Sequence, residues 1–291
     1  MRPENHRPLP YFDALLTLLD CHPILEQTFG RHVHWGYWEN PPPDQPNATD
    51  FANAAEHLTR LVGDAGGITN GLRVLDVGCG FGGTLASLDE RFVDLDLHGL
   101  NIEFRQLARA KRKVLPSVSN QIHWVNANAC KLPFADESFD SVLAVECIFH
   151  FPDRLAFFRE AFRVLKPGGR LALSDFLAPS LLSPWAALIK RWPASTGFYG
   201  RCDVQFTFNK YQALAEATGF SVCVERDITR NTLPNYDFIH DLQKQIPFNS
   251  LSAMVQTLFL EYVSKLGLLR YGIIGFTKRS TPPALGRSGS T

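Results

Sequence analysis

The spacing of hydrophobic positions separates a middle part of the chain, with a regular alternation of elements, from two flanking parts without it. Between residues 72 and 177, short apolar runs bounded by glycine alternate with segments in which apolar residues recur every three to four positions. The first kind of segment is typical of buried parallel strands, and the second of amphipathic helices. This alternation predicts an α/β fold with a doubly wound sheet.

The predicted elements of the middle part are joined by helical crossovers, so its strands should run parallel. Strands are predicted over residues 72–78, 95–102, 122–129, 139–151 and 170–177, with helices over 83–92, 104–114 and 153–165. Two later strand patterns, 221–228 and 271–279, form a hairpin-like finish. The complete sheet is therefore predicted to be mixed.

The flanking parts carry helices and irregular segments. Residues 11–29 have helical spacing, an aromatic and proline-rich stretch follows, and residues 51–63 form an amphipathic helix. After residue 178, segments rich in Trp, Phe and Pro precede a helix whose end is marked by Gly219. We divide the chain into an N-terminal helical lid (1–65), a core (66–178), a cap with the C-terminal strands of the same domain (179–279), and a tail whose composition predicts disorder (280–291).

Composition and charge exclude several classes of function. Hydrophobic residues make up 45% of the 291 residues, and 29 Lys and Arg balance 29 Asp and Glu. A neutral chain lacks the basic surface that nucleic acid or an anionic membrane requires. No apolar run approaches the roughly 20 residues of a membrane span, and the N-terminus has no signal core. The six cysteines are scattered without metal-ligand spacing, which predicts reduced thiols, no metal cofactor and a cytoplasmic location.

The turn VLDVGCGFGG after the first predicted strand is the candidate ligand site. Ligands of such sheets bind beyond the carboxyl ends of the strands, and glycines let the backbone approach them closely. Gly78 and Gly80 with Gly83 satisfy the dinucleotide fingerprint. The same two glycines with Gly82, preceded by Asp76, satisfy the pattern acid-x-G-x-G-x-G. The turn alone leaves NAD(P) and S-adenosylmethionine open.

The end of the second predicted strand favours S-adenosylmethionine. A dinucleotide fold places an acid there, about twenty residues after the glycines, to bind the ribose. Here the residue at this tip is Asn101, which can still hydrogen-bond ribose hydroxyls, while Asp94 and Asp96 lie at the opposite edge of the sheet. Asp76 suits the ammonium group of a methionine, or alternatively caps the following turn.

Two later segments, NANACKLPFADESFDSVLAVECIFHF and LKPGGRLALSDF, resemble motifs of the class I S-adenosylmethionine-dependent methyltransferases. Together with LDVGCGFGG they make the resemblance strong over residues 66–178 and weaker outside this range. It implies a Rossmann-like sheet of seven strands with the last inserted antiparallel, and methyl transfer from S-adenosylmethionine. An NAD(P)-dependent oxidoreductase is the alternative, and an inactive binding module that keeps the cofactor fold is a third interpretation.

The resemblance also implies cofactor-binding roles. The segment HVHWGYW, after a helix beginning near Tyr11, resembles the entry segment of tailoring methyltransferases, among them antibiotic-sugar O-methyltransferases and sterol and tocopherol C-methyltransferases. Its aromatic residues either close over the cofactor or pack onto the core. Asn101 and Asn128 stand where the family often has acids, and Glu146 is alternatively a structural acid. The implied cofactor-binding residues are Tyr11, Tyr37, Trp38, Asp76, Gly78, Gly80, Gly82, Asn101, Asn128, Ala129 and Glu146.

Methyl transfer requires that the acceptor atom, the methyl group and the sulfur lie in line. An acceptor with a hydroxyl group also needs a base that removes its proton. His150 and Asp175 match a His and an Asp of the sugar O-methyltransferases, although the first His of the family's pair is Phe149 here. Either residue alternatively caps a neighbouring turn. The many aromatic residues of segments 180–206 and 230–265 predict a bulky, apolar acceptor.

The expected partner is therefore a hydrophobic small molecule of secondary-metabolite (natural-product) biosynthesis, with no nucleic acid and no membrane span. O-methylation is favoured, N- and C-methylation stay open, and a homodimer is compatible with the sequence. The isolated histidines are interpreted as solvated or structural; they are His57, His98, His123 and His240.

Overall fold

The computed structural model describes residues 10–40, 45–179, 202–246 and 251–280. Its strands are β1 (Arg73–Val77), β2 (Asp96–Asn101), β3 (Gln121–Asn126), β4 (Phe139–Val145), β5 (Leu165–Leu177), β6 (Phe220–Asp227) and β7 (Arg270–Lys278). Its α-helices are α1 (Pro10–Leu19), α2 (Pro23–Phe29), α3 (Ala48–Ala65), α4 (Gly83–Arg91), α5 (Phe104–Lys113), α6 (Arg154–Val164), α8 (Phe208–Thr218), α9 (Thr229–Thr232), α10 (Pro234–Gln245) and α11 (Leu251–Lys265). A short 3₁₀ helix, η1 (Ile148–His150), follows β4.

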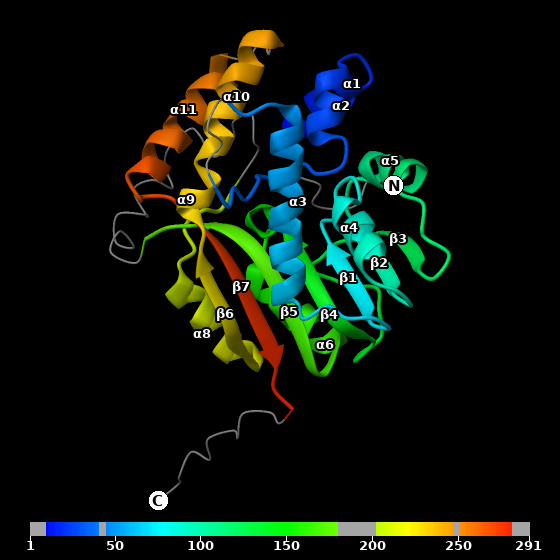
Figure 1. Ribbon diagram of the computed structural model, residues 1–291. Helices are drawn as coiled ribbons and strands as arrows, with labels where there is room; N and C mark the ends of the chain where they lie inside the picture. The colour runs from blue at the N-terminus through cyan, green and yellow to red at the C-terminus, as the bar shows by residue number, and fades with distance from the viewer. Residues whose placement is uncertain (1–9, 41–44, 180–201, 247–250, 281–291) are drawn as a thin grey trace, which may run out of the picture.

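These strands form one sheet in the order β3-β2-β1-β4-β5-β7-β6 (Figure 1). Strands β1 to β5 run parallel, and β7 pairs antiparallel with both β5 and β6. The predicted seven-stranded mixed sheet with an antiparallel last strand is confirmed. Because β1 to β5 are parallel, their carboxyl ends lie along one edge of the sheet.

Helices cover both faces of the sheet, as the apolar runs of the central strands require. Helix α3 lies in front of the sheet in Figure 1, and its Leu58 and Val62 pack with residues of α4 and the strands. On the other face, Phe157 and Phe158 of α6 pack with Tyr211 of α8. All five of these side chains are almost completely buried, so the core is continuous on each side.

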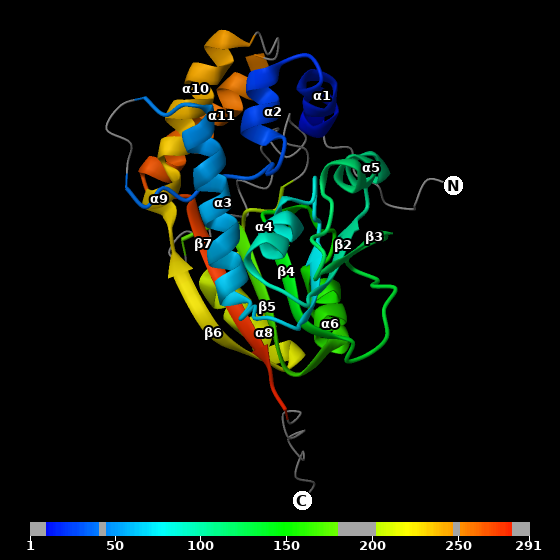
Figure 2. The same cartoon turned by 45° about the vertical axis from the view of Figure 1, so that its right-hand side comes forward.

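A third apolar cluster lies over the carboxyl edge of the sheet. Helices α1, α2 and α10 contribute Leu15, Leu25 and Phe238, and Phe81 from the turn after β1 belongs to the same cluster. Figures 1 and 2 show α1, α2, α10 and α11 together at this end of the molecule. The N-terminal helices therefore form part of a roof above the strand ends, where ligands of such sheets bind.

Three predicted boundaries differ most from the structure. Residues 11–29 form two helices, α1 and α2, because Pro23 starts a new helix and lacks the N–H that would continue the first. Strand β4 ends at Val145 because Glu146 has a φ of 48°, which takes the chain out of the strand. Strand β5 begins at Leu165, directly after α6, rather than after the turn.

Parts of the predicted cap and tail, residues 180–201, 247–250 and 281–291, lie outside the described residues. Five of the aromatic residues on which we based the apolar acceptor are among them: Trp185, Trp192, Phe198, Tyr199 and Phe248. Within the described ranges, no helix combines the length and the apolar character needed to cross a membrane.

Candidate active site

The glycine turn after β1 forms the floor of a cavity, here called the first cavity. The N–H groups of Gly78 and Cys79 both donate to the carbonyl oxygen of Leu100, at 2.7 and 3.1 Å, which ties the turn to the end of β2. Gly78 and Gly80 have φ of 70° and 53°, the region that favours glycine. A Cβ on Gly80 would meet only Gln106 Oε1, at 4.0 Å, so its open side faces the cavity.

Gly82 and Gly83 both allow close packing, and of the two Gly83 also lines the first cavity. A Cβ on Gly82 would lie 2.6 Å from the Trp124 ring, and Gly82 does not line the first cavity. A Cβ on Gly83 would lie 2.4 Å from the carbonyl oxygen of Arg31 and 2.5 Å from the ring of His32. Gly83 was not among the predicted cofactor-binding residues, although the absence of a side chain at this position lets the N-terminal segment reach the cavity.

Asp76 places a buried carboxyl group in the first cavity. Its side chain is 1% exposed, Thr84 is its hydrogen-bond partner, and its Oδ2 has no hydrogen-bond partner among the described residues. Burial raises the pKa of Asp76 to about 8. An unpaired buried carboxyl oxygen suits a cationic group of a ligand, because the cation would stabilise the charged form.

Two asparagines and a glutamine line the same cavity. Asn101 accepts the N–H of Glu103 at 3.2 Å and donates to Gln106 Oε1 at 2.8 Å. Gln106, which the sequence analysis missed, belongs to the first turn of α5 and shares the cavity wall with Asn101. Asn128 Oδ1 accepts the N–H of Cys130 at 2.9 Å, and Asn128 and Ala129 both line the cavity.

The N-terminal segment reaches the cavity through other residues than those predicted. Tyr11 and residues 31–34 line the first cavity. Tyr37 and Trp38 line neither cavity: Tyr37 accepts a hydrogen bond from Arg226, and Trp38 donates to Asn235 Oδ1 at 3.1 Å within a buried cluster. Neither ring therefore closes over the first cavity as expected: Trp38 packs the N-terminal segment onto α9 and α10, whereas Tyr37 contacts α3 and β6.

A second, mainly apolar cavity adjoins the first. Its walls include Phe29, Phe51, Phe149, Phe176 and Leu242, and the segment after residue 201 adds Cys202 and Val204. The residues that line both cavities are Tyr11, Val33, His34, Glu146 and His150. A group transferred between ligands in the two cavities would pass these side chains.

Glu146 stands at this junction and is strongly held. Its Oε2 accepts the N–H of Trp35 at 3.0 Å and the hydroxyl of Tyr271. Burial raises the pKa of Glu146 to about 8, so the carboxyl group is mostly protonated near neutral pH. Its left-handed backbone is unusual for a residue other than glycine, and such conformations concentrate at functional sites.

Among the described residues, His150 is one of the two histidines that line both cavities. The hydroxyl of Tyr11 lies 3.4 Å from His150 Nε2, and the two rings stack with centroids 6.2 Å apart. Cys202 Sγ lies 3.8 Å from Nδ1. His34 also lines both cavities, but Trp35 O and Thr59 occupy its two ring nitrogens at 2.9 and 3.0 Å, and burial lowers its pKa to about 3. His34 is therefore structural.

Asp175 lies apart from both cavities. Its carboxylate accepts hydrogen bonds from Arg154 and from the Tyr211 hydroxyl, the latter at 2.6 Å, and its side chain is completely buried. It lines neither cavity. In the part of the chain that the structure describes, the Asp175 carboxylate thus reaches neither cavity, and its position does not support the predicted catalytic role.

The first cavity fits S-adenosylmethionine by the chemistry of its donors. Asp76 offers an unpaired carboxyl oxygen for an ammonium group, and the open side of Gly80 leaves room where a side chain would intrude. Asn101 and Gln106 offer amide groups for hydroxyls. Tyr11 offers an aromatic ring near the second cavity, which suits a sulfonium cation.

The fold and this cavity define a class of cofactor-dependent enzyme, and comparison with known proteins identifies it. Residues 75–173 match the family described as "Methyltransferase domain". Methyltransferase GfsG of Streptomyces halstedii is 32% identical over 217 residues, 72% of this chain and 73% of that protein. A 27-O-demethylrifamycin SV methyltransferase of Amycolatopsis mediterranei is 33% identical over 230 residues, 77% of each chain.

Among solved structures, the geranyl diphosphate C-methyltransferase of Streptomyces coelicolor A3(2), in complex with S-adenosyl-L-homocysteine, matches with a TM-score of 0.67. The match has 16% identity and covers 94% of this chain and 100% of that one, which shows a shared fold. The chain belongs to the class I S-adenosylmethionine-dependent methyltransferases that act on small molecules. The alternative of an NAD(P)-dependent oxidoreductase is not supported, since these relatives are methyltransferases.

Proposed function

We propose that this enzyme methylates a hydroxyl group of a bulky, largely apolar small molecule in natural-product biosynthesis. The observation that carries the proposal is the junction between the two cavities, where His150 lines the wall of both. The mainly apolar second cavity supports the proposed apolar character of the acceptor. The relative named 27-O-demethylrifamycin SV methyltransferase supports the proposed O-methylation.

In this proposal S-adenosylmethionine occupies the first cavity. Asp76 would pair with its ammonium group, and Asn101 with Gln106 would contact the ribose. Asn128 and Ala129 would edge the adenine, as the family resemblance implies. The N-terminal helices act as a lid and the segments after residue 178 as a cap over the acceptor. A homodimer also belongs to this proposal, and sedimentation velocity measures it directly.

The chemistry follows from the cofactor and from His150. When bound in the first cavity, S-adenosylmethionine would supply a methyl group on a positively charged sulfur, and loss of the methyl group would leave a neutral thioether. His150 accepts the proton of the acceptor's hydroxyl group while the oxygen of that hydroxyl forms a bond to the methyl carbon. Tyr11 orients the imidazole ring of His150. The apolar walls of the second cavity exclude water from the reacting groups.

Calorimetric titration tests the first cavity. S-adenosylhomocysteine should bind with micromolar affinity, and NADH should not bind. Acceptor specificity is then tested with matched apolar compounds that carry a hydroxyl, an amine or an activated carbon. Methylation confined to the amine or the carbon compound would contradict the O-methylation proposal.

Replacement of His150 tests its proposed role as the general base. For His150→Ala and His150→Gln, kcat should fall about 10²- to 10⁴-fold with an unchanged affinity for S-adenosylhomocysteine. Activity should recover partly at high pH, where a phenolic acceptor loses its own proton. Unchanged turnover in both variants would return His150 to a structural role.

A further inference from the structure

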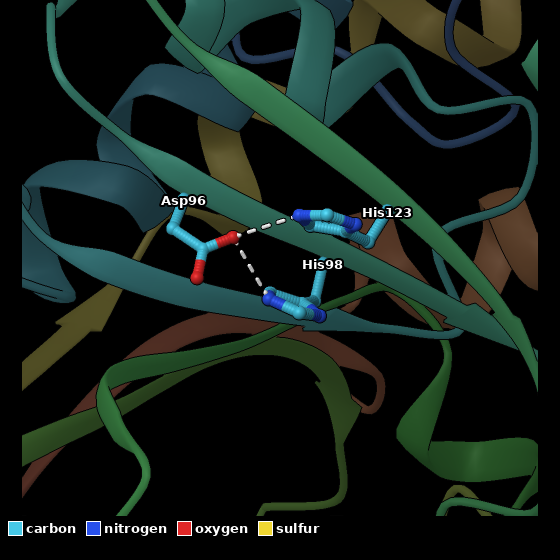
Figure 3. Close-up of side chains that lie close together, drawn as sticks. All are labelled: Asp96, His98 and His123. Carbon is cyan, nitrogen blue, oxygen red and sulfur yellow. Dashed lines mark ion pairs between the residues drawn. The ribbon is translucent and has the colours of Figure 1, made fainter.

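A cluster of three potential metal ligands lies away from both cavities, on strands β2 and β3. Asp96 and His98 are two positions apart on β2, so their side chains share one face of the sheet. His123 of β3 is the register partner of His98, and the two rings stack with centroids 4.6 Å apart (Figure 3). The backbone of two paired strands therefore holds the three side chains together.

The distances within this cluster suit a divalent transition-metal ion. Asp96 Oδ1 lies 2.9 Å from His98 Nε2 and 3.2 Å from His123 Nε2, as the dashed lines of Figure 3 mark. The three ligand atoms all lie within 4.8 Å of one another. Ligand atoms at ordinary zinc–nitrogen and zinc–oxygen distances stand roughly 3.4 Å apart around a tetrahedral ion. Small side-chain adjustments would bring the three atoms to this spacing.

The cluster also contains buried polar atoms without hydrogen bonds. His98 is only 7% exposed, and T-shaped contacts with Phe134 and Phe139 hold its ring. Asp96 Oδ1 lies near two ring nitrogens, yet it accepts no hydrogen bond of acceptable geometry in the part of the chain that the structure describes. An ion bound between the three groups would satisfy this oxygen.

Arg73 competes with an ion for the same groups. Its Nε lies 3.0 Å from Asp96 Oδ2 and donates to His98 Nε2 at 3.3 Å. This hydrogen bond requires a lone pair on Nε2 that faces the cluster, and a metal ion needs the same lone pair. The Arg73 side chain is 38% exposed and can turn into solvent.

We propose that Asp96, His98 and His123 form a site for one zinc-type divalent ion, with water as the fourth ligand and Arg73 as the competing cation. Two imidazoles with one carboxylate are a common zinc donor set. Among the described strands, β3 is at the edge of the sheet and pairs with β2 alone, so the ion clamps this edge strand in place. Asn101, at the other end of β2, is roughly 16 Å away by strand geometry, so cofactor binding is independent of the ion.

The test titrates the purified, metal-free protein with Co²⁺ and then Zn²⁺. One equivalent of Co²⁺ should produce the visible bands of a tetrahedral site without thiolate charge transfer, and Zn²⁺ should displace it and raise Tm. His123→Asn should weaken binding at least tenfold; its side chain is 48% exposed, so folding is preserved. Arg73→Gln should tighten binding severalfold. His57→Asn, at an exposed position of α3, is the matched control and should bind as the wild type does.

Absence of tetrahedral bands, or a cobalt spectrum dominated by thiolate charge transfer, would overturn the proposal. Equal zinc affinity of the wild type and His123→Asn would also overturn it, since the ion would then be held elsewhere. An affinity for S-adenosylhomocysteine that is the same with and without zinc is expected from the separation of the two sites.

Discussion

At the scale of single residues, Gly80 is a position where the backbone itself lines the first cavity and a side chain would project into it. Gly80→Arg should reduce affinity for S-adenosylhomocysteine at least a hundredfold, about 2.8 kcal/mol, because the new side chain fills the cavity. Gly71→Arg is a matched control: Gly71 also has a positive φ, of 78°, but it is exposed and nothing lies near its Cβ position. The control should share the backbone strain and keep binding. Equal loss in both variants would mean that strain, not the cavity, explains the effect.

Asp76 provides a second prediction at the scale of residues, which concerns the proton released when a ligand binds. Its pKa of about 8 leaves the carboxyl group mostly protonated at pH 7. Pairing with a ligand ammonium should lower this pKa, so binding of S-adenosylhomocysteine should release close to one proton at pH 7 and almost none above pH 9. Titration in buffers of different ionisation enthalpy measures this release. Asp76→Asn should abolish it, and a buffer-independent enthalpy in the wild type would contradict the pairing.

The same raised pKa has a consequence for stability without ligand. A carboxyl group with a raised pKa in the folded state favours folding fully below its ordinary pKa of 3.8, and this contribution is lost as the pH rises through about 8. Between these values the free energy of unfolding should therefore fall with rising pH, and Glu146 acts in the same direction. In Asp76→Asn this fall should be smaller, as urea unfolding at pH 6 and pH 8.5 would measure.

At the scale of elements, a buried ion network holds residues 202–206, here called the strap, against the rest of the site. Arg154, at the start of α6, donates to Asp175, to the Tyr211 hydroxyl and to the carbonyl oxygen of Asp203 in the strap. Its guanidinium also lies 4.1 Å from the Phe206 ring centroid. The N–H of Asp203 donates to the carbonyl oxygen of Phe149, next to His150. Asp175 therefore holds the strap, which lines the second cavity, indirectly through Arg154.

Loss of this network should weaken binding of the acceptor more than binding of the cofactor. Tyr211→Phe removes one hydroxyl and should raise KM for the acceptor severalfold, with an unchanged affinity for S-adenosylhomocysteine. Arg154→Met should have a larger effect and destabilise the fold by about 3–5 kcal/mol, because the Asp175 carboxylate loses its partner. Steady-state kinetics and denaturant unfolding measure both. A change in cofactor affinity larger than the change in KM would contradict the assignment of the strap to the acceptor side.

At the scale of the whole molecule, the first cavity connects the N-terminal helices to the sheet. Tyr11 and residues 31–34 face the turn of residues 78–84 across it, so one ligand should hold both parts together. At about 100 times its Kd, S-adenosylhomocysteine should add about 2.7 kcal/mol of stability. Hydrogen exchange should slow in residues 10–34 and 76–84 and stay unchanged in α8 and β6, which line neither cavity. Protection confined to residues 76–129 would contradict a lid function.

Much of the fold was predictable because its signals are local. The alternation of apolar runs with helical spacing between residues 72 and 177 is a property of neighbouring positions, and it led to the correct α/β sheet. Strand ends were less predictable: nothing in the apolar run around Glu146 shows that this residue adopts a positive φ. The residues that hold its carboxyl group, Trp35 and Tyr271, are far away in the sequence.

The sequence by itself determined the class of enzyme and the place of the cofactor turn, because the glycines and Asp76 act through the backbone that carries them. Tertiary structure alone decided which side chains face a cavity. Trp38 lies in the core because it donates a hydrogen bond to Asn235. Asp175 is buried because Arg154 and Tyr211 donate hydrogen bonds to its carboxylate. The metal-ligand cluster likewise exists only through the pairing of β2 with β3. The physical reason is common to these cases: a side chain's role depends on partners that only the folded chain brings within hydrogen-bond distance.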